Sequence, residues 1–370
     1  MGIYEELHVP RIINAMGTYT IYGGSKMSSQ TNEDMKDAAA SFIDLNLLQK
    51  KTGQAIARLT LNEAAYVCNG AAAGIYLGLL AAVALHCGKK IRYLTRQDLK
   101  ESQILVFRSH RSPYDIVMEQ LGVSVTELAY SNHTLPCPQE DMDAAISHRT
   151  AAIYYLESGW TAPGAPSLKE TIEAAKRHGL PIILDAAAML PPADNLWKYT
   201  KAGVDLAVFS GGKDLKGPQA SGLILGRKEL IDLLLESAFP KHGYGRFLKV
   251  GKEEIVGLYS ALKQYLAQDQ EARLQDAEDQ VKLACSILNA HPGYQAARSY
   301  PNEAGQPIPR VLVNLTGQSA DAKDILCYLS CCSPPIIASA ADQSSFYLNP
   351  MTLTKEEMEW ICSQILLYSR

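Results

Sequence analysis

The chain has 370 residues, of which 47% are hydrophobic and 20% are charged, a composition typical of a folded globular enzyme and too apolar for a disordered chain. Its 35 Lys and Arg residues against 39 Asp and Glu residues give a formal net charge of −4, which provides no broad basic surface for nucleic acid. The length predicts two or three domains, or one large α/β domain with an appendage.

The eight cysteines are scattered, and no two of them form a CxxC pair. We therefore expect reduced thiols in a cytoplasmic protein, with no zinc site and no required metal. The first 17 residues lack the basic and then apolar pattern of a signal peptide. The longest charge-free apolar run, 71–85, is too short to span a bilayer, so no membrane association is expected.

Short apolar segments alternate with helical ones between about residues 60 and 226. Strands are predicted at 65–68, 103–107, 123–128, 151–156, 181–184, 205–209 and 221–225, and helices at 71–86, 113–121 and 167–178. This alternation predicts an α/β fold with a mainly parallel sheet and helices on both faces. Ligands of such sheets bind at the carboxyl ends of the strands.

The pattern changes after about residue 250. Residues 252–286 predict one long helix or two consecutive helices, 310–315 a strand, 336–350 a hairpin and 355–368 a closing helix. We therefore expect an N-terminal segment (1–30), a large α/β domain (31–255) and a small C-terminal α+β domain (256–370).

Two charged residues follow predicted strands of the large domain. Lys213 lies in a glycine-rich turn directly after the strand that ends at Phe209, where glycines permit close approach of a ligand. Asp185 ends the apolar strand that begins at Pro181, and a carboxylate there needs a cation or hydrogen bonds. A solvated loop lysine and a helix-capping aspartate are the alternative interpretations.

The turn Asn69-Gly70-Ala71 follows another strand and opens an apolar helix, so it presents free N–H groups and a positive dipole end to an anion. An ordinary strand-to-helix turn is the alternative. A lysine, a carboxylate and an anion site at strand ends together suit pyridoxal 5′-phosphate (PLP), which needs a Schiff-base lysine, a partner for its pyridine nitrogen and a phosphate cup.

The Asn69–Ala73 turn and five other segments resemble the SelA-like branch of the fold-type-I PLP-dependent enzymes, which includes D-glucosaminate-6-phosphate ammonia-lyase and selenocysteine synthase. The five segments are RIINAMGTYTIYGG (11–24), LQKKTGQAIARLT (48–60), ILDAAA (183–188), FSGGKDLKGPQASG (209–222) and GRFLKVGKEEIVGL (245–258). The resemblance implies the fold-type-I transferase fold and PLP as cofactor. It also implies Lys213 as Schiff-base residue and general base, and Asp185 as partner of the pyridine nitrogen.

The resemblance assigns further roles by position. Phosphate contacts are implied for Asn69, Gly70, Ala71 and Ser210. A residue stacked on the cofactor ring is expected at His110 or, alternatively, at Arg111. The loop with Gly217 and Gln219 is expected to approach the phosphate of a second subunit, which implies a homodimer or a higher homo-oligomer.

The implied reaction is α,β-elimination with deamination of an amino acid or of a phosphorylated amino sugar acid similar to D-glucosaminate 6-phosphate. An amino-acid racemase, an aminotransferase or a selenium-transferase-like enzyme are the enzymatic alternatives, and an RNA-binding or assembly protein is the non-enzymatic one. We expect no tRNA-binding domain ahead of the matching region, which argues against work on tRNA. Substrate phosphate or carboxylate is expected to bind the basic segment with His242, Arg246 and Lys249. Alternatively, Arg310 at the start of a predicted strand of the small domain binds a substrate carboxylate.

Overall fold

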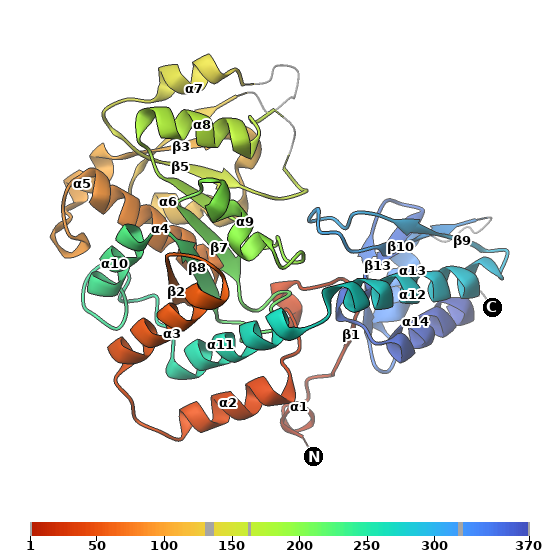
Figure 1. Ribbon diagram of the computed structural model, residues 1–370. Coiled ribbons are helices and arrows are strands. Elements are labelled where there is room, and N and C mark those ends of the chain that lie inside the picture. Colours follow the sequence, from red (N-terminus) through yellow and green to blue (C-terminus); the bar gives the residue numbers. More distant parts are fainter. Residues whose placement is uncertain (1, 130–136, 162–163, 317–320, 369–370) are drawn as a thin grey trace. The chain divides into compact units, whose positions relative to one another are not determined.

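The computed structural model describes residues 2–129, 137–161, 164–316 and 321–368 (Figure 1). The chain divides into two compact units, a large one formed by residues 27–267 and a small one formed by residues 1–26 and 268–370. Each unit is described by itself below.

The large unit contains a seven-stranded sheet with the order β2-β8-β7-β6-β5-β3-β4. Its strands are β2 (Ala64–Cys68), β3 (Gln103–Phe107), β4 (Ser124–Leu128), β5 (Thr150–Leu156), β6 (Ile182–Asp185), β7 (Leu206–Ser210) and β8 (Gly222–Gly226). Strands β4, β3, β5, β6 and β7 pair in parallel, and β8 lies antiparallel between β7 and β2. The mainly parallel sheet predicted from the sequence is thereby confirmed.

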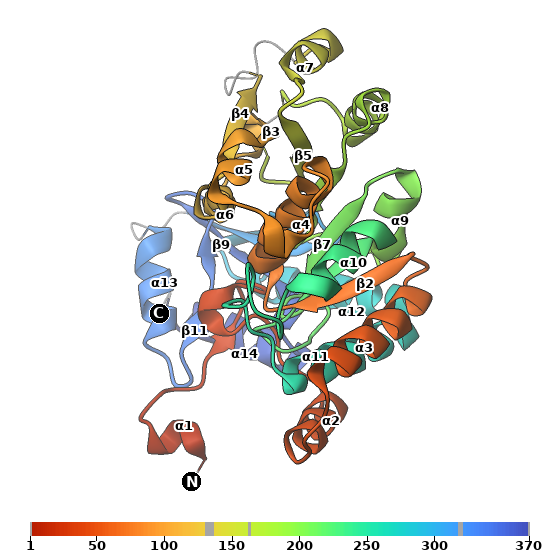
Figure 2. The same ribbon diagram turned by 90° about the vertical axis from the view of Figure 1, so that its left-hand side faces the viewer.

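Helices cover both faces of this sheet (Figures 1 and 2). They are α2 (Ser29–Ala39), α3 (Leu45–Leu59), α4 (Ala71–His86), α5 (Arg96–Glu101), α6 (Ile116–Leu121), α7 (Gln139–Ala145), α8 (Leu168–His178), α9 (Asn195–Ala202), α10 (Lys228–Ser237) and α11 (Lys252–Ala267). One apolar core joins α4, α6 and α10 to the sheet, and a second core joins α3, α8, α9 and α11 to its other face. Because both faces are covered, the central strands β5, β6, β7 and β8 are apolar and buried along most of their length.

Helix α4 is the central element of the first core, and Ala73–Ala84 are all buried in it. The helix is apolar on every side, as expected for an element surrounded by protein. A Cβ atom added at Gly74 would lie 2.6 Å from Cγ1 of Val208 in β7. The small residue at this position therefore lets the first turns of α4 lie close to the sheet.

The small unit contains a four-stranded antiparallel sheet, β12-β13-β10-β9, and a short parallel pair, β1-β11. Its strands are β1 (Ile13–Asn14), β9 (Tyr294–Ser299), β10 (Arg310–Leu315), β11 (Ile336–Ile337), β12 (Ser339–Ala340) and β13 (Ser345–Leu348). Its helices are α1 (Ile3–Glu6), α12 (Gln270–Asn289), α13 (Ala322–Ser330) and α14 (Lys355–Tyr368). The expected hairpin forms as β12 and β13.

The two units differ from the predicted segments 1–30, 31–255 and 256–370 at both boundaries. Ile13 and Ala15 of the N-terminal segment are buried in the core of the small unit, because β1 pairs with β11. At the other boundary, the predicted helical stretch forms the two helices α11 and α12. Leu258 and Leu262 of α11 pack in the second core of the large unit, so the division falls at the α11–α12 turn.

Within the described residues, no helix combines the length and the apolar character needed to cross a membrane.

Candidate active site

The carboxyl ends of β2, β3, β5, β6 and β7 lie at one edge of the large sheet, because β2 and β7 are each antiparallel to β8 and therefore run in the same direction. Asn69 follows β2, Asp185 is the last residue of β6 and Ser210 is the last residue of β7. His110 lies in the short turn of 3-10 helix η3 (Arg108–His110) directly after β3. The topology thus brings together predicted residues that are far apart in the sequence.

The turn between β2 and α4 forms an uncapped helix N-terminus. Gly70 has a φ of 110°, in the region that favours glycine, and no side chain caps the helix. Gly222, the first residue of β8, pairs with Cys68 of β2 and with Ser210 of β7. A Cβ atom added at Gly222 would lie 2.5 Å from the carbonyl carbon of Gly70. Glycine at this position therefore allows β8 to pass directly beside the turn.

Asn69 has a buried side-chain oxygen, Oδ1, for which no hydrogen-bond partner is found among the described residues. A 180° rotation of the amide would place an N–H donor at the same point. With the dipole of the 16-residue helix α4 and the free N–H groups of its first turn, this arrangement suits an anion.

Asp185 is almost fully buried, with 3% of its surface exposed. The Ala187 N–H donates to Oδ1 at 3.0 Å, and the Tyr154 hydroxyl donates to Oδ2 at 3.2 Å. Burial raises the pKa of Asp185, whereas the two hydrogen bonds and the positive charge of Lys213 act in the opposite direction. A cationic partner would therefore stabilise the ionised form of this buried carboxyl group.

Lys213 lies in a tightly hydrogen-bonded loop between β7 and β8. The Gly217 N–H donates to the Gly211 carbonyl at 2.8 Å, and the Gly211 N–H donates to the Ser221 carbonyl at 2.9 Å. The Lys213 side chain is half-buried, with Nζ 5.8 Å from the centre of the Trp160 ring. The loop thus fixes the backbone of the lysine at the same edge of the sheet as Asp185.

His110 and Arg111, the two alternatives for a ring-stacking residue, lie in different surroundings. His110 is buried, its ring packs edge-on against Tyr155 at 4.4 Å between ring centres, and its Nδ1 accepts the Leu156 N–H at 3.3 Å. Burial lowers the pKa of His110 to about 4, so the imidazole is neutral. Arg111 instead pairs with Asp115 and Glu127.

The basic segment with His242, Arg246 and Lys249 forms turns beside the second turn of α4. The Phe247 ring packs edge-on against Tyr76 of α4 at 5.6 Å between ring centres. The guanidinium of Arg246 lies 5.1 Å from the centre of the Phe239 ring, and His242 and Lys249 are exposed. Their side chains are therefore available to an anion from solvent.

Arg310 belongs to the small unit, so the structure assigns it no position relative to the residues above. The expected strand forms as β10, which begins at Arg310 and pairs with β9 on one side and with β13 on the other. The Arg310 side chain is buried, pairs with Glu303 at 2.9 Å and lies 3.8 Å from the centre of the Tyr347 ring.

Three residues near these strand ends were not among the site residues expected from the sequence, where Tyr154 and Trp160 were weak candidates more typical of the core. Tyr154 bonds Asp185, Trp160 lies beside Lys213, and Ser109, next to His110, has a buried hydroxyl with no partner among the described residues. The sequence signal for Tyr154 and Trp160 was their place at the end of a strand and in the loop after it. Aromatic residues there are more often part of the core.

The comparisons with known proteins agree with this geometry. The D-glucosaminate-6-phosphate ammonia lyase of Salmonella typhimurium (strain 14028s / SGSC 2262) is 28% identical over 98% of this chain and 97% of its own length. A 5'-C-glycyluridine monooxygenase-decarboxylase from Streptomyces sp is 30% identical over 86% of this chain and 78% of its own. A solved structure of D-glucosaminate-6-phosphate ammonia-lyase superposes with a TM-score of 0.83 at 27% identity, covering 99% of this chain and 97% of that one.

PLP fits the residues found at the carboxyl edge. The uncapped N-terminus of α4 and the buried Asn69 amide suit its phosphate, and the buried Asp185 carboxyl suits its pyridinium nitrogen. Residues 12–278, well over half of the chain, match the family described as SelA, L-seryl-tRNA selenium transferase. The chain is therefore a PLP-dependent enzyme with the type-I fold, and it belongs to the SelA family.

Proposed function

We propose that the chain is an ammonia lyase that acts on a phosphorylated amino sugar acid of the D-glucosaminate 6-phosphate class. The net reaction removes ammonia from the substrate and leaves a 2-keto-3-deoxy acid. The observation that carries this proposal is the ammonia lyase relative, which matches nearly the whole length of both chains in sequence and in structure.

Bound PLP draws electrons from the substrate Cα and so makes its C–H bond acidic. Lys213 is proposed to hold the cofactor covalently and, once released, to take the Cα proton on Nζ. The half-buried position of its side chain beside Trp160 restricts water around this amine. The Cβ hydroxyl then leaves as water with the proton taken from Cα, and hydrolysis of the resulting enamine consumes one water and gives keto acid and ammonia.

Asp185 is proposed to keep a positive charge on the pyridine nitrogen. A carboxylate in a buried site interacts strongly with a cation because little water screens the pair. Asn69, Gly70, Ala71 and Ser210 are proposed to bind the cofactor phosphate, since β8 brings the Asn69 turn and the end of β7 to either side of Gly222. The neutral, edge-packed ring of His110 is proposed to stack on the cofactor, whereas the guanidinium of Arg111 is held by two carboxylates.

The substrate phosphate or carboxylate is proposed to bind the segment with His242, Arg246 and Lys249, which packs on α4 near the cofactor-phosphate turn. Arg310 stays a second proposal for the substrate carboxylate. Its Nε is buried without a partner among the described residues, although its other end pairs with Glu303.

The chain is further proposed to work in the cytoplasm as a homodimer or a higher homo-oligomer, without nucleic acid. Gln219 is exposed at the end of the Lys213 loop, where it could approach a second subunit, and Gly217 is buried at the base of that loop. Sedimentation of the PLP-loaded protein tests the assembly. A purely monomeric active enzyme would contradict it.

The test of the function is incubation of the PLP-loaded protein with D-glucosaminate 6-phosphate and with its unphosphorylated form, while keto acid and ammonia are measured. We expect the two products in equal amounts and a clear preference for the phosphorylated compound. A racemase would exchange the Cα hydrogen with solvent without releasing ammonia, and an aminotransferase would release keto acid only with an added amino acceptor. Either result would replace the lyase assignment.

A further inference from the structure

Tyr154 is the last but two residue of β5, and its side chain is completely buried. Its hydroxyl donates to Oδ2 of Asp185 at 3.2 Å. The other carboxylate oxygen, Oδ1, accepts the Ala187 N–H. Among the described residues, Tyr154 is the one whose side-chain hydroxyl bonds the Asp185 carboxylate.

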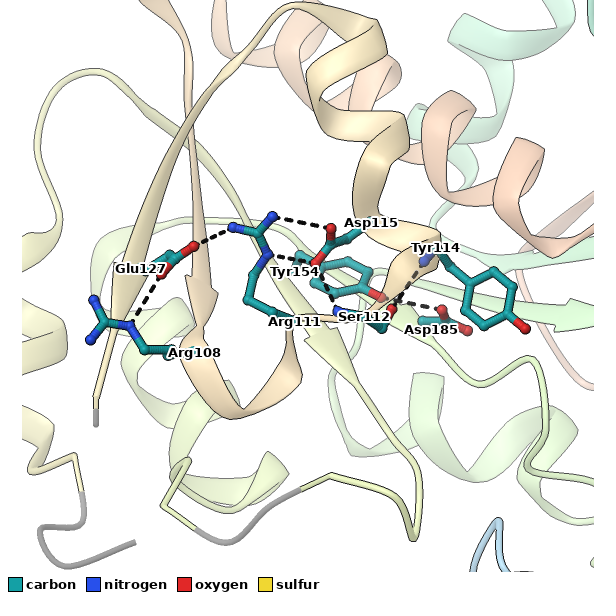
Figure 3. A network of polar contacts seen from close by, with 8 residues as sticks. All are labelled: Arg108, Arg111, Ser112, Tyr114, Asp115, Glu127, Tyr154 and Asp185. Atoms are coloured by element: carbon teal, nitrogen blue, oxygen red, sulfur yellow. Dashed lines mark hydrogen bonds and ion pairs between the residues drawn. The ribbon is translucent and has the colours of Figure 1, made fainter. Parts of the chain in front are cut away.

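Ser112 lies beside the Tyr154 hydroxyl and extends its contact with Asp185 into a chain of polar groups, most of which is drawn in Figure 3. The Tyr114 N–H donates to Oγ of Ser112 at 3.3 Å, which helps to fix Ser112 in this place.

Ion pairs closer to the surface fix the outer end of this chain. The Ser112 N–H donates to Asp115 at 3.0 Å, and Asp115 forms two contacts with the Arg111 guanidinium, at 2.6 and 3.2 Å. Glu127 pairs with both Arg111 and Arg108 (Figure 3). The Asp115 side chain is only 5% exposed, so its pair with Arg111 is little screened by water.

We propose that Tyr154 is a positioning residue for the reaction, which orients the buried Asp185 carboxylate and keeps it ionised, and that Ser112 and the Arg111–Asp115 pair hold Tyr154 in place. This inference rests on the proposed role of Asp185 toward PLP. The contacts of Tyr154 are all made within the protein itself, so their effect on Asp185 can be measured without the cofactor.

The proposal has a defined pH signature. The titratable groups that face Asp185 are Tyr154 and Lys213, and Asp115 acts on Tyr154 from the far side. Burial raises the pKa of Asp185 above its unfolded value, and the Tyr154 hydrogen bond opposes this shift. Removing that bond raises the folded pKa further. Between the unfolded and the folded pKa, the folded Asp185 still binds a proton that the unfolded chain has released. The free energy of unfolding therefore falls as the pH rises from about 4 toward neutrality.

The experiment compares Tyr154→Phe with Tyr66→Phe in the full chain. Tyr66 of β2 is equally buried, and its hydroxyl donates to the Phe239 carbonyl at 3.0 Å, so its loss removes one buried hydrogen bond but no contact with a carboxylate. Thermal midpoints of the cofactor-free proteins are measured from pH 5 to pH 8. We expect the loss in thermal midpoint relative to the wild type to grow with pH for Tyr154→Phe and to stay constant for Tyr66→Phe.

The PLP-loaded proteins provide the second readout. Without the Tyr154 hydroxyl, the Asp185 carboxylate is more basic and holds the proton that it shares with the pyridine nitrogen more strongly. The PLP ring then carries less positive charge. The pH midpoint of the visible absorbance should therefore move upward by about one unit in Tyr154→Phe, since a hydrogen bond to a charged group shifts a pKa by roughly this amount. The kcat should fall more than the KM changes.

Ser112→Ala keeps the test open if Tyr154→Phe does not fold, because it removes the hydroxyl that lies beside the phenol and should produce a smaller shift of the same sign. The proposal would be overturned if the Tyr154, Tyr66 and Ser112 variants lost the same amount of thermal midpoint at every pH and the pH midpoint of the visible absorbance did not move. If the wild-type chain bound no PLP, the proposed function would fail, while the cofactor-free pH profiles would still decide the role of Tyr154.

Discussion

The two ends of the strands in the large sheet each hold an aspartate, Asp185 buried and Asp205 partly buried, and the two are satisfied in different ways. Asp205, at the amino end of β7, accepts the Ile182 N–H at 2.9 Å and pairs with Arg227 at 3.4 Å. Asp185, at the carboxyl end of β6, accepts from one N–H and one phenol, with Lys213 as the nearby cation. Burial raises the pKa of both carboxyls.

The surroundings of the two aspartates explain this difference. At the amino edge, the Arg227 N–H also donates to the Asp205 carbonyl at 2.8 Å. Asp205 therefore finds its partners within the protein itself. At the carboxyl edge, buried atoms of Asn69 and Ser109 have no partner among the described residues, and a helix begins without a cap. Buried polar groups are normally satisfied, so the unsatisfied Asn69 oxygen beside an uncapped helix N-terminus favours a ligand at this end of the strands.

The largest effect is expected for Lys213→Ala. Loss of the amine removes both the covalent attachment of PLP and the proposed base, so turnover should fall by about a thousandfold or more. The visible absorbance of the attached cofactor should disappear, while the far-UV circular dichroism stays that of the wild type. Unchanged absorbance would instead assign the attachment to another residue, such as Lys216 in the same loop.

Asp185→Asn and Asp205→Asn test the contrast between the edges directly. Asp185→Asn should keep PLP bound but lower kcat by about a hundredfold, because a neutral amide does not hold a positive charge on the ring. Asp205→Asn should leave kcat within about threefold and lower the free energy of unfolding by about 1–3 kcal/mol, through loss of a partly buried charged pair. Similar kcat losses in both variants would remove the functional distinction between the edges.

His110 supplies a prediction about pH. Its folded pKa of about 4 lies below the unfolded value, so the unfolded state binds more protons between these values. His110 therefore destabilises the fold progressively as the pH falls from about 6.5 to 4, by about 3 kcal/mol at the lower end. His110→Gln should flatten this part of the stability profile, whereas His242→Gln, at an exposed position, should leave it unchanged. Parallel profiles for all three proteins would contradict a buried neutral imidazole.

A smaller effect is expected for Gly222→Ala. The added methyl group would meet the backbone of Gly70 and displace the anion-binding turn, so PLP affinity should fall by about tenfold. Quenching of tryptophan fluorescence measures this, since Trp160 lies beside Lys213. Gly78→Ala is the control, because its methyl group would press on Ile183 in the middle of the sheet. Equal affinities in the wild type and in Gly222→Ala would argue against the turn as the phosphate site.

Local sequence signals were sufficient to predict the alternating strands and helices, the Asn69 turn and the charged residues that end β6 and follow β7. The antiparallel position of β8 was not predictable, because its apolar run has no signal for direction, yet it brings Gly222 beside Gly70. The place of α11 in the large unit also depends on tertiary packing. Tyr154 could not be distinguished from a core tyrosine, because its hydrogen-bond partner Asp185 is distant in the sequence.

The most direct test of the central claim is borohydride reduction of the PLP-loaded protein, followed by peptide mapping of the modified residue. We predict a visible absorbance band that reduction abolishes, with the pyridoxyl group on Lys213. A protein that remains colourless with added PLP, or a modified residue outside the loop between β7 and β8, would contradict the assignment of the active site to the carboxyl edge of the sheet.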